Sequence, residues 1–203
     1  MIIIQLLVGS MDVFCYIVGC EKTRDAMVID PGGGADLLAA RAKKENLNIK
    51  YIFNTHHHWD HTYDNAALKK LTGAKIVMHA LEDDRVSREA KADIRITDEK
   101  TFRLGNIDFQ VFHTPGHSPG GLCLYAQGQL FTGDTLFVGD SGRTDLPGGH
   151  RPTLGASIRM LMKLPDDTVV WPGHDYGRTK SSTIGNEKRT NINAKEYGYY
   201  VGD

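Results

Sequence analysis

The sequence predicts an α/β fold with two strand-rich halves, before and after about residue 100, that form a two-layered sheet core with helices outside. Strand-like apolar runs alternate with single helix-like segments in both halves, and none of these runs is long. No low-complexity linker separates the halves. The 203 residues suit one domain, 1–203, because single domains commonly reach roughly 250 residues before they split.

The first half begins with short apolar runs that we expect to be strands at residues 2–8, 13–18, 26–29, 49–53 and 75–78. Apolar spacing predicts helices at residues 35–45 and 62–71. The charged segment 82–91 is typical of a solvated helix face. The glycines after Asp30 lack a phosphate-binding pattern, so we interpret them as a sharp turn.

The second half has five further strand-like runs, at residues 101–104, 107–112, 122–125, 130–132 and 169–171. A turn at Gly105-Asn106 joins the first two runs. Glycine-rich residues 139–149 indicate a long surface loop, and loops of that length are often functional.

Residues 55–61, Thr-His-His-His-Trp-Asp-His, are the densest cluster of side chains suited to chemistry. They lie between the predicted strand 49–53 and the predicted helix 62–71, on the kind of loop that often carries catalytic groups. Imidazoles and carboxylates are ligands of first-row metals. The spacing His56-x-His58-x-Asp60-His61 allows one loop to supply ligands to two adjacent ions, and an internal aspartate at this register argues against a tag fragment.

Other predicted strands also end in side chains able to bind metal. His117 lies in a rigid Thr-Pro-Gly-His loop, Asp134 follows the strand 130–132, and His174 follows the strand 169–171. Asp30 ends the strand 26–29 and either supports a ligand from behind or is an ordinary aspartate of a turn.

The remaining histidines have weaker contexts. His57 should point away from the metals, His79 ends a strand alone, His113 precedes a turn, and His150 lies in the long loop. We interpret all four as structural or exposed.

Composition excludes several classes of function. Lysine and arginine number 24 against 25 acidic residues, so no global positive field favours nucleic acid or an anionic membrane as partner. The apolar start is far shorter than a membrane span and lacks a basic leader, so we expect a cytoplasmic protein. Cys15, Cys20 and Cys123 form neither an even disulfide set nor a Cys-x-x-Cys pair, and we expect reduced, mainly structural thiols.

With these motifs in this order, the sequence resembles the metallo-β-lactamase superfamily over nearly its whole length. The resemblance implies an αβ/βα four-layer sandwich of two half-repeats, with the metal site at one edge of the sheets. Carried over residue by residue, it implies that one ion is bound by His56, His58 and His117, that the other is bound by Asp60, His61 and His174, and that Asp134 bridges them. The implied cofactors are two divalent ions, zinc with iron or manganese as alternatives, and a shared water of lowered pKa gives a hydroxide nucleophile that Asp60 also orients.

Within the superfamily the sequence is similar to short bacterial relatives of the hydroxyacylglutathione hydrolases (glyoxalase II). The phrases that carry this similarity are Ile-Asp-Pro-Gly-Gly (29–33), Gly-Asp-Thr-Leu-Phe (133–137), Gly-Arg-Thr-Asp (142–145), His-Asp-Tyr (174–176) and Ser-Thr-Ile-Gly-Asn-Glu (182–187). The resemblance implies hydrolysis of a small-molecule thioester such as S-lactoylglutathione. A thiol of pKa about 8.5 leaves readily, so no strong general acid is needed.

The same resemblance gives two residues a role in binding glutathione. Arg143 matches a basic residue that binds a carboxylate, and Tyr176 matches a tyrosine that contacts glutathione. The alternatives are a pair of Arg143 with Asp140 or Asp145, and packing of Tyr176 beside His174.

The chain departs from full-length glyoxalase II near its end. His174 and Ser182 are nearly contiguous where those enzymes have a helical insertion, and residues 193–200 carry little of their basic stretch. Other small thioesters, or a different low-molecular-weight thiol, therefore stay open as substrates.

Other activities also fit the same ligands. The main alternative is an iron-dependent persulfide dioxygenase, in which His56, His117 and Asp134 would bind a single iron. Lactonase, β-lactamase and nuclease activities occur on the same scaffold, and the fold does not choose among them. A pI of about 6.7 without basic clusters argues against a nuclease. A regulatory metal-binding domain is disfavoured because all seven ligand positions are filled, and the oligomeric state is not readable from the sequence.

Overall fold

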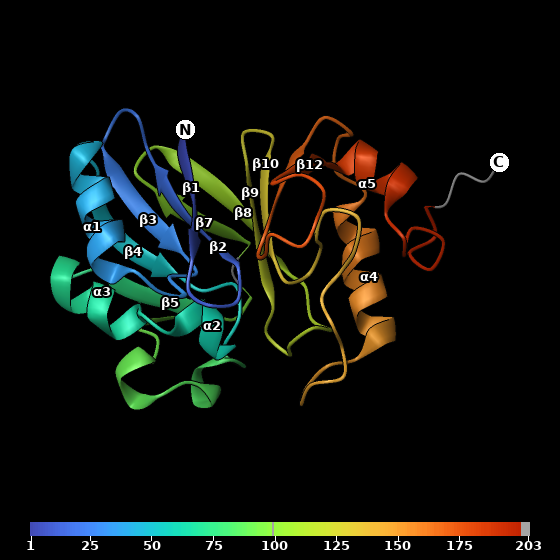
Figure 1. Ribbon diagram of the computed structural model, residues 1–203, viewed down its shortest axis with the longest axis horizontal. Coiled ribbons are helices and arrows are strands. Elements are labelled where there is room, and N and C mark those ends of the chain that lie inside the picture. The colour runs from blue at the N-terminus through green and yellow to red at the C-terminus, as the bar shows by residue number, and fades with distance from the viewer. Residues whose placement is uncertain (99, 200–203) are drawn as a thin grey trace. The chain divides into compact units, whose positions relative to one another are not determined.

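The computed structural model describes residues 1–98 and 100–199, and it divides into two compact units, Met1–Gln110 and a second that starts at Val111. Each unit is described separately below (Figure 1). Tyr200, the last residue of the C-terminal segment 193–200 discussed above, lies outside the described residues. The prediction of a single domain over residues 1–203 stays a prediction.

The first unit contains a six-stranded mixed sheet. Its strands follow chain order: β1 (Ile2–Val8), β2 (Val13–Gly19), β3 (Asp25–Ile29), β4 (Asn48–Phe53), β5 (Lys75–His79) and β6 (Ile94–Ile96). β1, β2 and β3 pair antiparallel, whereas β3, β4, β5 and β6 pair in parallel. The predicted strands are confirmed and β6 is additional. Parallel pairing brings the carboxyl ends of β3, β4 and β5 to one edge of the sheet.

Two helices cover one face of this sheet, α1 (Ala35–Lys44) and α3 (Asn65–Thr72) (Figure 1). Leu38 of α1 and Leu68 of α3 are fully buried in a core that they share with Val28 and Ile52 of the strands. This burial of an apolar stripe is what the helical spacing in the sequence predicts.

The helix predicted over residues 62–71 is present as α3, although it begins three residues later than predicted, at Asn65, and ends at Thr72. α2 (Trp59–Thr62) begins inside the histidine cluster, and α3 starts only after Asp64. The Asp64 carboxylate accepts a hydrogen bond from the backbone N–H of Ala35, at 2.8 Å, so it satisfies a free donor in the first turn of α1. Asp64 itself leaves helical geometry, with φ −100° and ψ 14°.

The interpretation of residues 82–91 as a solvated helix face is wrong. The segment forms two single 3-10 turns, Asp83–Arg85 and Arg88–Ala90. Glu82 is fully buried and Asp83 is 3% exposed. Charge patterning alone did not predict this burial, because the partners of both carboxylates come from elsewhere in the chain.

The second sheet has the strand order β12-β11-β10-β9-β8-β7. Its members are β7 (Thr101–Leu104), β8 (Ile107–His113), β9 (Leu122–Ala126), β10 (Gln129–Gly133), β11 (Val169–Pro172) and β12 (Ser182–Thr183). β10 and β11 pair in parallel, and the boundary between the two units falls inside β8. Residues 139–149 contain neither a helix nor a strand, as expected for a long loop.

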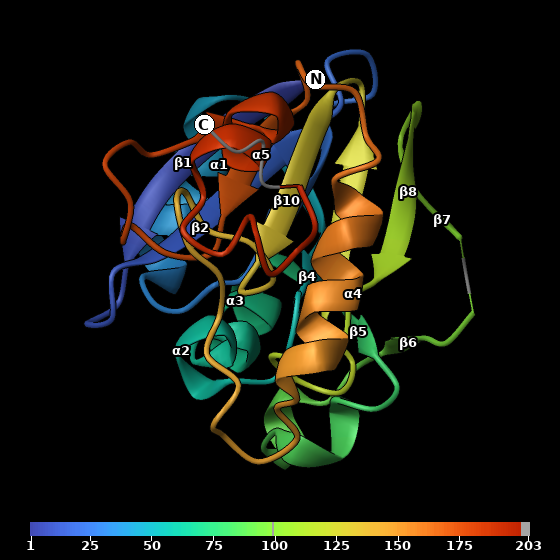
Figure 2. The same ribbon diagram turned by 90° about the vertical axis from the view of Figure 1, so that its right-hand side faces the viewer.

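The second unit has two helices, α4 (Arg151–Leu161) and α5 (Ile184–Thr190), in the half where the sequence predicts helix-like segments without giving their bounds. Figure 2 shows α4 running beside β10. Ile158 of α4 and Ile184 of α5 are fully buried in one core with Leu130 and Val170.

None of the helices in residues 1–98 and 100–199 is long and apolar enough to cross a membrane. All three cysteines are free and buried, as predicted. Burial raises the pKa of Cys15 well above its usual value and that of Cys123 to about 11. These two thiols therefore fit the structural role expected for them.

Candidate metal centre

The histidine cluster of the first unit follows β4 at the sheet edge where β3 and β5 also end. Ile29 of β3 pairs with Phe53 of β4, so Asp30 and Thr55 leave the sheet side by side. The cluster joins β4 to α2, which confirms the predicted strand-to-helix position, although Asp60 and His61 lie on α2 itself. Within this unit, Asp30, His56 and His61 offer ligand atoms within 4.8 Å of one another.

Asp30 supports the cluster from behind. One carboxylate oxygen accepts the backbone N–H of Thr55 at 2.8 Å, and the other accepts the Thr55 hydroxyl at 2.7 Å and lies 3.0 Å from Nδ1 of His61. Asp30 is 1% exposed. Since donors of its own unit occupy both oxygens, Asp30 is suited to position ligands, which was one of the two roles that the sequence left open.

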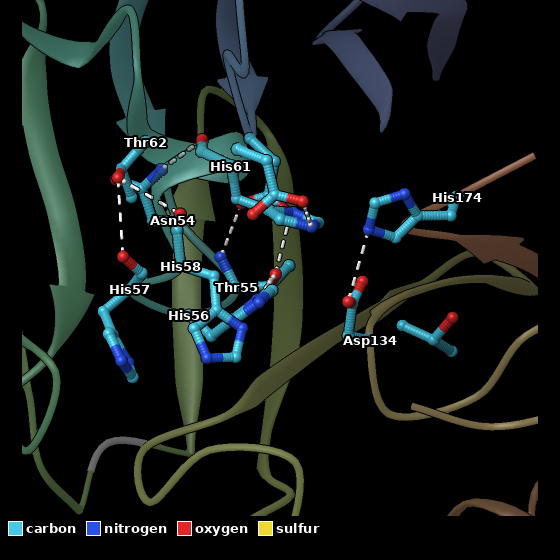
Figure 3. A network of polar contacts seen from close by, with 12 residues as sticks. Asn54, Thr55, His56, His57, His58, His61, Thr62, Asp134 and His174 are labelled. Atoms are coloured by element: carbon cyan, nitrogen blue, oxygen red, sulfur yellow. Dashed lines mark hydrogen bonds and ion pairs between the residues drawn. The ribbon is translucent and has the colours of Figure 1, made fainter. Parts of the chain in front are cut away.

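This hydrogen bonding fixes the tautomers of two proposed ligands (Figure 3). The Asp30 carboxylate only accepts, so Nδ1 of His61 carries the ring proton and Nε2 carries the lone pair. The Thr55 hydroxyl gives its one proton to Asp30 and therefore accepts from Nδ1 of His56, at 3.0 Å. Both Nε2 atoms are thereby prepared to bind a metal ion.

The other two residues of the motif lie on the same loop. The His58 ring packs edge-on against that of His56, with centroids 4.7 Å apart, and the half-buried Asp60 has a carboxylate oxygen 3.8 Å from Nε2 of His61. The first unit therefore brings together four of the seven predicted ligands: His56, His58, Asp60 and His61.

Sequence reasoning missed two groups that hold this loop. The buried Glu82 carboxylate accepts from the backbone N–H of His57 at 3.1 Å and contacts Nδ1 of the same residue, which gives His57 the structural role expected of it. Asn54 and Asn65 exchange side-chain hydrogen bonds, and Asn54 also donates to the carbonyl of His61 at 3.2 Å. The sequence could have indicated a role for Asn54, because it is a polar residue at the end of a strand. It could not have singled out Glu82, because Glu82 lies in a segment with many other charged residues.

The second unit brings together the other three predicted ligands. Gly133 of β10 pairs with Pro172 of β11, so Asp134 and His174 leave neighbouring parallel strands together. His117 comes from the loop after β8, which a hydroxyl contact of 2.9 Å between Thr114 and Thr135 ties to the loop of Asp134. All three ligands are nearly buried.

One oxygen of Asp134 lies close to both histidines. Its Oδ2 atom is 3.4 Å from Nε2 of His117 and 3.3 Å from Nε2 of His174, and Figure 3 shows the second contact. Two ligand atoms that are each about 2.1 Å from a tetrahedral ion lie about 3.4 Å apart. The spacing therefore fits a carboxylate oxygen that would have one ion in common with His117 and one ion in common with His174.

His117 is oriented in the same way as His56 and His61. Its Nδ1 atom is 2.7 Å from the carbonyl oxygen of Arg143, which only accepts, so Nε2 carries the lone pair. Gly142 allows this close approach, because a Cβ atom there would lie 2.9 Å from Nδ1 of His117 and 2.0 Å from the carbonyl oxygen of Asp134. The donor sets in both units thus fit divalent metal ions.

The two predicted substrate residues lie on the surface of the second unit. The Arg143 guanidinium makes a bidentate pair with Asp145, with both N–O distances 2.6 Å, which holds the pKa of that carboxyl down at about 2. Tyr176 is 56% exposed and stacks on His174, with centroids 4.5 Å apart. The structure therefore shows both alternatives, the pairing of Arg143 with Asp145 and the packing of Tyr176 beside His174. The roles of Arg143 and Tyr176 in substrate binding stay predictions.

The remaining histidines make local contacts of the structural kind expected. Nδ1 of the buried His79 accepts the backbone N–H of Leu81. The exposed His113 contacts the carbonyl of Pro119, and the exposed His150 contacts the Thr153 hydroxyl at the start of α4.

Comparison with known proteins identifies the family. A model of the metallo-β-lactamase superfamily matches residues 8–174. An uncharacterized protein of Aquifex aeolicus is 37% identical, over 97% of this chain and 98% of its own length. The hydroxyacylglutathione hydrolase GloC of Haemophilus influenzae is 35% identical, over 86% of this chain and 91% of its own.

Solved structures agree with this match. A BLEG-1 B3 metallo-β-lactamase superposes with a TM-score of 0.89 at 32% identity, over 95% of this chain and 99% of its own. ETHE1 from Myxococcus xanthus also gives a TM-score of 0.89 at 32% identity, over 99% of this chain and 88% of its own. The predicted metallo-β-lactamase fold is confirmed, with two mixed sheets flanked by helices. The chain belongs to the metallo-β-lactamase superfamily.

Proposed function

We propose that the chain is a binuclear metal-dependent hydrolase that cleaves a thioester such as S-lactoylglutathione. The observation that carries the binuclear part is the single oxygen of Asp134 that lies 3.4 Å and 3.3 Å from two imidazole nitrogens. Similarity to hydroxyacylglutathione hydrolases supports the thioester part.

In this proposal His56, His58 and His117 would hold one ion, Asp60, His61 and His174 would hold the other, and Asp134 would be a ligand of both. When bound, two divalent ions, zinc with iron or manganese as alternatives, lower the pKa of a water toward neutrality and polarise a carbonyl. Asp60 also orients the attacking water through its carboxylate, while Asp30 keeps the ring protons of His56 and His61 on Nδ1.

We assign the thiol part of the substrate to Arg143 and Tyr176. The Arg143–Asp145 pair is exposed, so exchange of Asp145 for a substrate carboxylate costs little. The exposed face of Tyr176 offers an apolar contact and a hydroxyl. Glutathione and other small thiols that carry a carboxylate fit this assignment, whereas nucleic acid and membranes are not expected as partners, and a cytoplasmic location stays a prediction.

The second candidate is the iron-dependent persulfide dioxygenase, and similarity to ETHE1 favours it. Its single iron would use His56, His117 and Asp134, so His58 is a ligand in the hydrolase only. This difference gives a test that separates the two functions.

The test is His58→Ala, with metal content, S-lactoylglutathione hydrolysis and oxygen uptake with glutathione persulfide measured on the same samples. The hydrolase proposal predicts that the variant loses metal and loses hydrolysis by more than about 100-fold. His113→Ala, which changes an exposed histidine, serves as the control and should keep both. Full hydrolysis in His58→Ala would remove the ligand assignment, and oxygen uptake that persists there would favour the dioxygenase.

A further inference from the structure

A pocket of about 450 Å³ opens beside the ligand loop, wholly within the first unit. The proposed ligand His58 and its neighbour Trp59 line one part of it, and Tyr63, Ala66 and Ala90 line others. Its volume lies in the range typical of small-molecule sites. Its position means that a substrate bound at His58 has room to extend into it.

Two exposed aromatic rings give the pocket an apolar wall. Trp59 is 60% exposed and Tyr63 is 70% exposed, and their rings meet edge-to-face with centroids 6.5 Å apart. Large apolar side chains that stay exposed beside a functional loop commonly mark a binding surface. Flat apolar groups gain both contact area and ring contacts there.

The charge of the pocket points to an anion. Among the described residues that line it, Arg85 is the one with a permanent charge, and no carboxylate is present. Asp83 and Asp84, which precede it, are paired with Arg95 and Lys91. Arg85 itself makes no ion pair within residues 1–98 and 100–199, so its guanidinium fork is available to a carboxylate.

We infer that this pocket is a subsite for the acyl part of the substrate, and that the favoured acyl group carries a flat apolar body and a carboxylate. The inference rests on the proposed function, because it assumes that the reacting carbonyl lies at the metals that His58 helps to bind. Arg143 and Tyr176 are already assigned to the thiol part. A lactoyl group has neither ring nor charge and uses little of the pocket, so S-lactoylglutathione is a substrate but not the best one.

A matched pair of probes tests the pocket by direct binding. Phenylacetate and phenylacetamide share their shape and differ in charge, and calorimetry with the full, metal-loaded chain gives the Kd of each. We expect phenylacetate to bind about fivefold more tightly, as for an exposed ion pair at its favourable end. Equal Kd values would overturn the inference.

Two arginine variants identify the source of the preference. Arg85→Gln should abolish it, whereas Arg88→Gln should keep it, because Arg88 is also exposed but does not line the pocket. A preference that survives Arg85→Gln would mean that the carboxylate binds the metal ions, and it would overturn the inference. Tyr63→Ala should weaken both probes by the same factor, and a variant that binds both unchanged would also contradict the pocket.

Hydrolysis of S-lactoylglutathione by the same preparation separates this inference from the proposed function. Turnover without a preference for the carboxylate probe would contradict the proposed subsite and keep the proposed hydrolase function. A preference for the carboxylate probe without turnover would support an anion-binding pocket but contradict the hydrolase function, and the assignment of the pocket to the acyl group would then also be wrong.

Discussion

Asp30 shows how one buried side chain controls the chemistry of others that are distant in sequence. It accepts from the Thr55 backbone, the Thr55 hydroxyl and His61. A carboxylate only accepts hydrogen bonds, so with these donors it holds both imidazole rings in one tautomer. A neutral amide has a single oxygen acceptor and an NH2 donor, so it cannot accept all three hydrogen bonds.

Asp30→Asn should therefore weaken both the fold and the metal site. The amide places a donor against at least one buried donor, which costs about 1–3 kcal/mol in the free energy of unfolding. Metal affinity should fall by about 10–100-fold. Chemical denaturation and metal titration measure the two effects, with the exposed Asp36→Asn as control. Unchanged metal affinity would leave Asp30 a turn residue only.

Cys20 should titrate near neutral pH. A hydrogen bond from the Thr23 side chain is the main cause that lowers its pKa from 9.0 to about 7. The folded state then favours the thiolate, so this stabilisation is complete above pH 9, where the unfolded thiol also ionises, and is lost as pH falls through about 7. The ¹³Cβ chemical shift of Cys20 should have its midpoint near 7, and Thr23→Val should raise it. A wild-type midpoint near 9 would contradict this prediction.

At the scale of elements, the sequence predicts strands better than helices in this chain. Val13 to Val18 and Ile49 to Phe53 carry enough apolar side chains to identify buried strands directly. Helix boundaries are harder to predict because they involve tertiary partners: Asp64, the residue before α3, accepts a hydrogen bond from the Ala35 backbone, 29 residues away. Burial of Glu82 likewise depends on His57, which is 25 residues away.

The start of α5 depends on one capping hydroxyl. The Thr183 side chain accepts the backbone N–H of Asn186 at 3.1 Å. Thr183→Ala should lower the free energy of unfolding by about 1 kcal/mol, whereas Thr183→Ser keeps the acceptor and most of the stability. Equal destabilisation by both substitutions in urea titrations would show that the methyl group matters instead.

The parallel pair β10 and β11 presents Asp134 and His174 only because glycine follows β11. A Cβ atom at Gly173 would lie 2.3 Å from Oδ1 of Asp134 and 2.8 Å from the carbonyl carbon of Gly133. Gly173→Ala should displace the carboxylate and lower metal content. Gly155→Ala in α4, where the nearest atom is 3.5 Å away at the end of the Arg159 side chain, is the matched control. Full metal content in Gly173→Ala would contradict the arrangement.

Across the whole molecule, the seven proposed metal ligands could be named from the sequence because four stand in one motif and three follow strands in recognisable phrases. The sequence did not predict the roles of Thr55, Glu82 and Gly142, since these roles come from hydrogen bonds and close approach in the folded chain. The pocket at Arg85 was hidden for the same reason. Its lining joins α2 and α3 to a segment that the sequence presents as a solvated helix.

If seven side chains hold two ions for thioester hydrolysis, metal content and activity must change together. Both can be measured on one sample of purified protein, by counting metal ions per chain and following hydrolysis of S-lactoylglutathione. We expect two ions per chain, hydrolysis that disappears when a chelator removes them, and recovery when zinc, iron or manganese is restored. A single iron per chain with oxygen uptake and no hydrolysis would contradict this expectation.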